Sequence, residues 1–331
     1  MLITKRAFLG ISGSLVAGLP VFAKNNLEAH QYWKSFKSKF ISRDGFLLDS
    51  YHKIVHSEGQ GVALVLSAYF KDKETFYKIL NWTENNLYNK DLGLYSWKWE
   101  IARGVTDPNN ASDGDLYIYW GLVLGHIFFK DKTLFEKANK LQSNLYSKCI
   151  KSVKVEDRSL EVLLPGAYGF VFKDGCVVNL SYYVRPAFYF AQKYFNKKWK
   201  TLFEDGAFLA SKSLELSEKK LVPNWISVSN KKISPWKDRP AVFGYDAIRA
   251  FLWFENLDKS YFIPSTLKAE VPLTATSLKY ENNAPVGFYA VKNYIRGEDV
   301  KLEQDLDYYS FSLVLLSFVL QQTEYLYETK F

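Results

Sequence analysis

The sequence predicts an all-α fold with two layers of helices, because two kinds of helical pattern alternate along it. Segments 116–129 and 307–320 are apolar nearly all round, as buried helices are. Segment 74–87 instead gathers its apolar side chains on one side, as an outer helix does. We expect roughly ten to twelve helices in total. Further helices are predicted at 133–146, 187–195 and 203–216.

Short strands are predicted only in one stretch between the helices, residues 150–180, which contains EVLLPGAYGFVF and GCVVNL. The 331 residues are 48% hydrophobic, and this composition excludes a disordered chain. Residues 24–331 contain no Pro- or Ser-rich linker, low-complexity tract or clear repeat. They are therefore predicted to form one domain.

The first 23 residues resemble an export signal. Lys5 and Arg6 precede an apolar stretch that ends with the small residues Val21 and Ala23. TKRAFLG is similar to a twin-arginine motif with Lys5 in the first arginine's place, so the general secretory and twin-arginine routes both stay open. The stretch is too short and interrupted to span a bilayer comfortably. We expect a periplasmic or secreted mature chain without stable membrane insertion.

The charge pattern argues against a nucleic-acid partner. The formal net charge is +8, or +6 without Lys5 and Arg6, and the basic residues are interspersed with acids as on a solvated surface. Aromatic residues make up 17% of the chain. Such a content indicates either an aromatic core or a cleft lined with flat faces for a ligand, and both readings stay open.

Cysteine and histidine give no sign of a metal centre. The two cysteines, Cys149 and Cys176, could form one disulfide in an exported protein or remain as buried thiols, and the sequence leaves both open. The four histidines show no spacing typical of metal ligands. No metal site is therefore predicted.

Acidic residues stand at three predicted helix starts. In SEGQ, Ser57 is predicted as the N-cap, Gln60 as its capping-box partner, and Glu58 as a first-turn residue. In ASDGD, Ser112 is predicted as the N-cap and is followed by Asp113. Each acid is followed by a glycine, which we expect to leave room for a ligand.

A third start, GYDAIRAFLW, places Asp246 in the first turn and Arg249 on the same helix face. The helix dipole alone favours such acids by about 0.3 to 1 kcal/mol each, so any one of them could be a simple helix-start residue. Three together indicate a shared acidic site. Two carboxyl groups across a gap, one protonated and one ionised, are the groups that hydrolyse a glycosidic bond. We expect Asp113 and Asp115 to help the acid keep its proton.

At these residues the sequence resembles glycoside hydrolase family 8, in particular its exported endo-β-1,4-glucanases associated with bacterial cellulose synthase. The resemblance covers nearly the whole mature chain and lies in ordered blocks: SEGQ (57–60), NWTENNL (81–87), ASDGDL (111–116), LLPGAYGF (163–170), NLSY (179–182), GYDAIRAFLW (244–253) and APVGF (284–288). It implies an (α/α)6 barrel with a few short strands in the loops, inversion at the anomeric carbon, and no metal or organic cofactor.

The resemblance also implies residue roles. Glu58 would be the general acid, Asp246 the base that activates water, and Asp113 a residue of the subsite where the sugar is distorted. An acid and a base in an inverting enzyme are expected about 6.5 to 9.5 Å apart. Tyr182 and Arg249 would hold the water and the base.

Aromatic residues are expected along the same groove. Tyr245 would line its wall according to the resemblance. Trp97 precedes ASDGD in an expected groove-lining loop, where its indole suits the apolar face of a pyranose. Trp99 is as well explained by core packing, and Trp225 and Trp236 flank a loop that could reach substrate.

Three positions depart from the family pattern. Val62 and Ala63 stand where relatives have a tyrosine and a glycine, and Asn224 stands where an aspartate is usual. These departures leave substrate length, subsite affinity and exact specificity open.

The predicted function is hydrolysis of β-1,4-glucan by a monomeric exported endoglucanase, with the cellulose synthase machinery as an expected partner. Chitosan, xylan or mixed-linkage glucan as substrate remains an alternative. So does a catalytically silent subunit that only binds glucan.

Overall fold

The computed structural model describes residues 19–230, 232–254, 257, 271–274, 286–300 and 306–323. Ten α-helices lie in this part of the chain, together with two short 3-10 helices at Leu180–Tyr182 (η1) and Leu214–Leu216 (η2). The α-helices are α1 (Leu19–Phe40), α2 (Ser57–Tyr69), α3 (Lys73–Asn86), α4 (Ser112–Phe129), α5 (Lys132–Cys149), α6 (Arg185–Tyr194), α7 (Lys198–Ser213), α8 (Ala247–Trp253), α9 (Val286–Arg296) and α10 (Tyr308–Thr323). The predicted leader falls mostly outside the described residues, and only its last five residues belong to α1.

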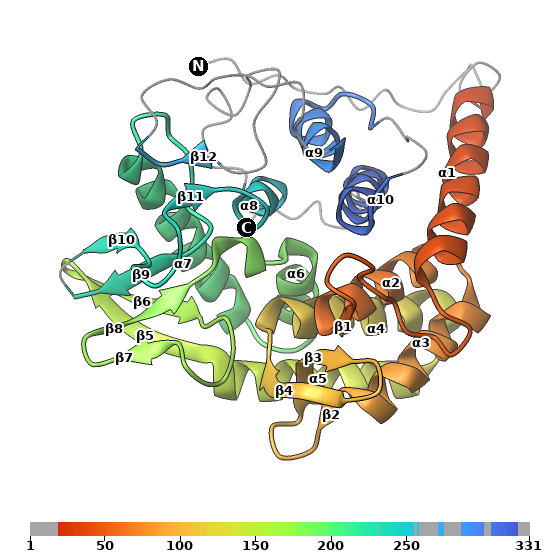
Figure 1. Cartoon of the computed structure of the whole chain (residues 1–331), viewed down its shortest axis with the longest axis horizontal. Coiled ribbons are helices and arrows are strands. Elements are labelled where there is room, and N and C mark those ends of the chain that lie inside the picture. The colour runs from red at the N-terminus through yellow and green to blue at the C-terminus, as the bar shows by residue number, and fades with distance from the viewer. Residues whose placement is uncertain are drawn as a thin grey trace.

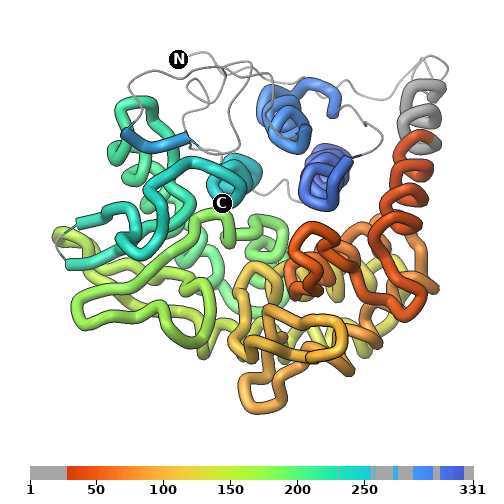
Figure 2. Tube along the Cα trace, viewed as in Figure 1, coloured from red at the N-terminus to blue at the C-terminus, as the bar shows by residue number. Residues whose placement is uncertain are grey.

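The helices form an inner and an outer layer, as the patterns predict. Every residue of α8 is buried, and α2, α4 and α10 are buried on nearly all sides. The outer helices α3 and α5 bury only one face, built from leucine, isoleucine and phenylalanine in α3 and chiefly from leucine in α5. The trace runs round the molecule in Figure 2, and α10 returns to pack against α1 and α2.

Side-chain caps fix where the outer helices begin. Asp72 accepts a hydrogen bond from the backbone N–H of Thr75 at 3.2 Å and so caps α3. Its second oxygen binds Lys37 Nζ at 2.7 Å and Trp33 Nε1 at 3.0 Å, which ties α1 to this helix start. Asp131 caps α5 in the same way through Thr133 N at 2.8 Å.

Twelve short strands occur in the described residues, more than the single predicted stretch. Four of them, β1, β2, β3 and β4, form one small sheet, and β7 to β10 form another in the order β10-β9-β8-β7 (Figure 1). The strands are β1 (Ile54–His56), β2 (Tyr88–Asn89), β3 (Leu94–Glu100), β4 (Gly104–Asn110), β5 (Ile150–Val155), β6 (Arg158–Leu163), β7 (Val171–Phe172), β8 (Gly175–Val178), β9 (Ile226–Ser229), β10 (Ile233–Pro235), β11 (Val242–Phe243) and β12 (Val271–Pro272).

One strand corrects the prediction of a loop before ASDGD. Residues 94–100 form β3, which pairs antiparallel with β1 in a register that places Val55 opposite Trp99. Trp99 packs against Trp82 with ring centroids 5.2 Å apart, so its role is packing. Trp97 lies two residues earlier on the same strand, where the pairing of β3 with β4 changes register.

Both cysteines are free and buried, which decides between the two readings left open by the sequence. Burial raises the pKa of each thiol to about 12, so neither is a reactive thiolate at neutral pH. Among the helices of the described residues, none is long and apolar enough to cross a membrane.

Candidate active site

The acids lie at the N-terminal ends of inner helices. Glu58 is the second residue of α2, after strand β1. Its helix is capped by His56, not by the predicted Ser57: His56 Nδ1 accepts a hydrogen bond from the backbone N–H of Gly59 at 3.0 Å. An imidazole nitrogen that accepts carries no proton, and burial lowers the pKa of His56 despite the nearby Glu58 carboxylate. The N-cap prediction was therefore displaced by one residue.

Gln60 has a structural role in place of the predicted capping one. Its Oε1 accepts from the backbone N–H of Leu47 at 2.6 Å, and its Nε2 donates to Thr83 Oγ1 at 2.8 Å. Because Gln60 is fully buried, these bonds replace its bonds to water. They anchor α2 to α3 and to the segment before β1. The helix start that carries Glu58 is therefore held in place.

Asp113 faces Glu58 from the first turn of α4. The N-cap of this helix is Ala111, not the predicted Ser112, whose Oγ donates to the Leu164 carbonyl at 2.8 Å. Burial, and after it the Glu58 carboxylate, raise the pKa of Asp113 well above its usual value, although Arg249 acts in the opposite direction. Asp113 is therefore a candidate for a protonated carboxyl at neutral pH.

Asp115, two residues further, points away from this site. Its oxygens accept from the backbone N–H of Tyr95 at 2.9 Å and from Asn110 Nδ2 at 2.8 Å. Burial raises its pKa to about 7. The expectation that Asp115 acts on the acid was wrong, because this carboxyl fastens β3 and β4 to α4.

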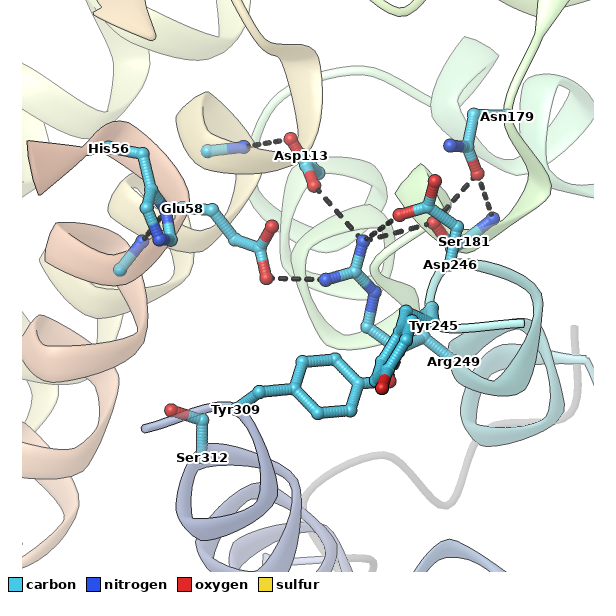
Figure 3. Close-up of polar contacts among 12 residues, drawn as sticks. His56, Glu58, Asp113, Asn179, Ser181, Tyr245, Asp246, Arg249, Tyr309 and Ser312 are labelled. Atoms are coloured by element: carbon cyan, nitrogen blue, oxygen red, sulfur yellow. Dashed lines mark hydrogen bonds and ion pairs between the residues drawn. The ribbon is translucent and has the colours of Figure 1, made fainter. Parts of the chain in front are cut away.

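Arg249 joins the three acids. Its Nη1 lies 2.5 Å from Glu58 Oε1, and its Nη2 lies 3.0 Å from Asp246 Oδ1 and 3.7 Å from Asp113 Oδ2. Figure 3 shows the guanidinium between the carboxylates. Asp246 occupies the N-cap position of α8, one residue before the first turn in which it was predicted, and Arg249 follows on the same face as predicted.

The charges of this cluster are coupled. Only 6% of the Arg249 side chain is exposed, compared with 26% for Glu58 and 29% for Asp246. Burial alone would lower the pKa of Arg249, but the three carboxylates raise it well above its usual value. Burial raises the pKa of Asp246, and Glu58 adds to this, while Arg249, Asn179 and Trp225 act against it. Arg249 thus compensates three acids that could not all remain charged without it.

A cavity of about 340 Å³ opens beside the acids. Glu58 and Asp113 line it together with Trp97, Tyr182 and the His52–Asp49 pair. His52 Nδ1 lies 2.6 Å from Asp49 Oδ2. An indole, polar side chains and carboxylates around one hollow suit a sugar, which has apolar faces and a hydroxyl rim.

Tyr182 lines the cavity, and Tyr245 directly precedes Asp246 in the chain. Burial, followed by the nearby Asp113 and Asp246, raises the pKa of Tyr182, so its phenol stays protonated and faces both acids. Tyr245 is 42% exposed, and its ring meets Tyr309 edge-on at 5.0 Å (Figure 3).

The glycines beside the acids make room for protein, not for a ligand as predicted. A Cβ on Gly114 would lie 2.1 Å from Ser57 Oγ and 2.8 Å from Glu58 N. A Cβ on Gly59, the glycine that follows Glu58, would lie 2.8 Å from the Tyr308 hydroxyl oxygen. Between α2 and α4 the close contacts are those of Gly114 and of Gly61, whose Cβ would lie 2.5 Å from the Tyr117 Cβ. These glycines allow α2 and α4 to pack backbone against backbone, which brings Glu58 and Asp113 together.

Sequence reasoning missed several residues of the site. Asn179 and Ser181 lie beside Asp246 and Arg249, although only Tyr182 of the block NLSY was assigned a role. Asn224 Oδ1 accepts from the backbone N–H of Ala247 at 2.9 Å and caps the helix that follows Asp246. The sequence does single out Asn224, because it stands where an aspartate is usual in the family.

Comparisons with known proteins agree with this geometry. The profile of "Glycosyl hydrolases family 8" matches residues 15–323. The chain belongs to glycosyl hydrolase family 8. It is 31% identical over 319 residues to a probable endoglucanase of Novacetimonas hansenii, covering 89% of this chain and 91% of that protein.

Solved structures give the same result. The endo-β-1,4-glucanase CMCax from Acetobacter xylinum superposes with a TM-score of 0.81 at 29% identity, covering 90% of this chain and 98% of that one. An endoglucanase from Komagataeibacter sucrofermentans gives 0.82 at 31% identity, covering 92% and 99%. The chain is thus a glycoside hydrolase of family 8, and the prediction of an (α/α)6 barrel is confirmed.

Proposed function

We propose that the chain is an inverting endo-β-1,4-glucanase in which Glu58 is the general acid and Asp246 the general base. The observation that carries this proposal is that these two carboxylates, which come from distant parts of the chain, lie on either side of one guanidinium, and that Glu58 lines a cavity together with Trp97 and Tyr182. The similarity to endoglucanases supports β-1,4-glucan as the substrate.

In this mechanism Asp246 takes a proton from the water that attacks the anomeric carbon. Arg249 keeps the Asp246 carboxylate charged and fixes one of its oxygens. Tyr182 is a neutral phenol beside Asp113 and Asp246, so it donates to the water or to the sugar without adding charge. Asp113, with its raised pKa, hydrogen-bonds the sugar at the reacting subsite.

The acid must be freed before it acts. An ion pair favours a charged carboxylate, whereas a general acid delivers a proton to the leaving oxygen. The Glu58–Arg249 pair therefore opens as glucan enters, and Glu58 turns to the glycosidic oxygen. Arg249 keeps Asp246 as its charged partner at 3.0 Å, so its charge stays compensated.

We further propose export to the periplasm or the medium and a role during cellulose secretion, with the chain acting as a monomer beside the cellulose synthase machinery. The N-terminal pattern of residues 1–23 supports export. A test is fractionation of the source cells together with cellulose yield in a deletion strain. A cytoplasmic enzyme or an unchanged yield would contradict this part.

The catalytic assignment is tested with Asp246→Asn, which preserves shape and removes the base. Hydrolysis of carboxymethyl-cellulose should fall by about 10² to 10⁴-fold, because that is the usual contribution of a general base. Thermal unfolding and cello-oligosaccharide binding should stay close to the wild type. Asp91→Asn, at an exposed turn, is the matched control and should keep full activity. Substantial turnover by Asp246→Asn would reject the assignment.

Stereochemistry and substrate are tested separately. Proton NMR of early product should show the α-anomer first, and the β-anomer first would refute inversion. A reducing-sugar assay over cellulose derivatives, chitosan, xylan and mixed-linkage glucan should give the highest rate on β-1,4-glucan. Glucan binding without hydrolysis of any polymer would point to a silent binding subunit.

A further inference from the structure

The segment before α6 supplies two buried polar side chains that touch the base and its arginine. Asn179 and Ser181 are each 1% exposed. Asn179 Oδ1 lies 3.0 Å from Ser181 N and 2.7 Å from Ser181 Oγ, and Ser181 Oγ lies 3.3 Å from Arg249 Nη2. Trp253 Nε1 donates to the Ser181 carbonyl at 2.8 Å and holds this backbone in place.

The direction of each hydrogen bond follows from the donors. A backbone N–H and a guanidinium only donate, so the Asn179 atom facing Ser181 N is the carbonyl oxygen, and Ser181 Oγ accepts from Arg249. The Ser181 hydroxyl hydrogen is then free to be donated to Asn179 Oδ1. The orientation of the Asn179 amide is therefore determined, and its NH2 group points the other way.

That NH2 group faces the Asp246 carboxylate (Figure 3). The Asn179 Nδ2 atom is buried, and among the described residues no acceptor meets the distance and angle of a hydrogen bond to it. A buried donor without an acceptor destabilises the fold, so such a donor is retained where the site uses it. Asp246 thus has Arg249 on one side and a fixed amide donor on the other.

We propose that Asn179 and Ser181 are positioning residues for the base: Ser181 orients both Arg249 and the Asn179 amide, and this amide holds the second side of the Asp246 carboxylate toward the attacking water. The inference rests on the proposed role of Asp246 as the base. It adds two residues to the site that act on Asp246 and not on the sugar.

The electrostatics agree with the geometry. Burial raises the pKa of Asp246, and Arg249 and Asn179 both lower it toward the range in which a base is ionised. Loss of either contact raises the pKa of Asp246 further. Since the base acts only when unprotonated, activity is then lost at a higher pH on the acidic side.

The test compares Ser181→Ala and Asn179→Ala with the wild type on a soluble β-1,4-glucan. For both variants, kcat should fall about 10- to 100-fold while KM changes little, because a small misplacement of a catalytic group has effects of this size. The acidic limb of the kcat/KM profile should move to higher pH. Asn179→Asp keeps the shape without the NH2 donors and should shift the limb in the same direction, which covers the case that Asn179→Ala does not fold.

Ser213→Ala is the matched control, because Ser213 is also fully buried and donates to a carbonyl, that of Ala210, at 2.7 Å. It should leave the pH profile unchanged. Unshifted acidic limbs in the Ser181 and Asn179 variants, or an equal shift in Ser213→Ala, would overturn the inference. A wild type that is inactive on every β-1,4-glucan would instead overturn the proposed function.

Discussion

Replacing Arg249 by methionine should destabilise the protein in a pH-dependent way. The substitution keeps an apolar stem of similar length but leaves Glu58, Asp113 and Asp246 without their shared cation. Breaking a buried ion pair by removing one partner costs about 3 to 5 kcal/mol. We expect a loss in this range at pH 7, because Arg249 and Asp113 are almost completely buried.

The sign of the pH dependence follows from proton binding. Burial, together with the Glu58 carboxylate, already raises the folded-state pKa of Asp113 and Asp246, and Arg249 opposes this. Without Arg249 both values rise further above those of the unfolded chain, so the folded variant binds more protons. Its stability is then greatest below the unfolded carboxylate pKa of about 4 and falls as pH rises through the folded values.

Urea unfolding at pH 4.5 and pH 7, followed by circular dichroism, measures this difference. Arg103→Met is the matched control: Arg103 pairs with Glu100 at 2.7 Å, but its side chain is 70% exposed. An exposed pair contributes only about 0 to 1 kcal/mol, so the control should show little loss and little pH dependence. A loss for Arg249→Met that is below about 1 kcal/mol, or equal at both pH values, would refute the reasoning.

Two further predictions concern the helix starts. Asn224→Asp places a carboxylate at the backbone N–H of Ala247, next to Asp246, and should raise the pKa of Asp246. The acidic limb of the kcat/KM profile should therefore move to higher pH. A limb at the wild-type pH would contradict this prediction. Gly114→Ala should destabilise the protein by about 1 to 3 kcal/mol and lower kcat, because the new Cβ would collide with Ser57 Oγ and displace Glu58. Thermal unfolding measures the loss of stability, and steady-state kinetics measure kcat. Wild-type values in both would contradict the close packing of α2 and α4.

Much of the fold was predictable because the buried face of a helix requires apolar residues at regular intervals in the sequence. The all-apolar segment 307–320 and the one-sided segment 74–87 became α10 and α3 with small shifts at their ends. Strand β3 was not predictable in this way, because it takes its conformation from pairing with β1, β2 and β4. Such pairing depends on residues distant in sequence.

Those residues of the site were predictable that are recognised from their neighbours in the sequence. Glu58, Asp113 and Asp246 stand out as acids at helix starts, and the structure brings all three to Arg249. The Glu58–Arg249 contact joins residues 191 positions apart, and no periodic pattern encodes such a contact. The cap at His56 was missed because histidine accepts a hydrogen bond only in its neutral form, and the burial that favours this form is not visible in the sequence.

The glycine-mediated contact between α2 and α4 affects how the family can change its substrate. The helix starts that carry Glu58 and Asp113 are fixed to each other, since either helix could shift only by separating backbones already in contact. Arg249 belongs to α8, a helix of seven residues held mainly by α9 and η1, and Asp246 is the N-cap of this helix. Mutations that accommodate a bulkier or differently substituted sugar should therefore accumulate around α8, while the opposite side of the cleft stays constant.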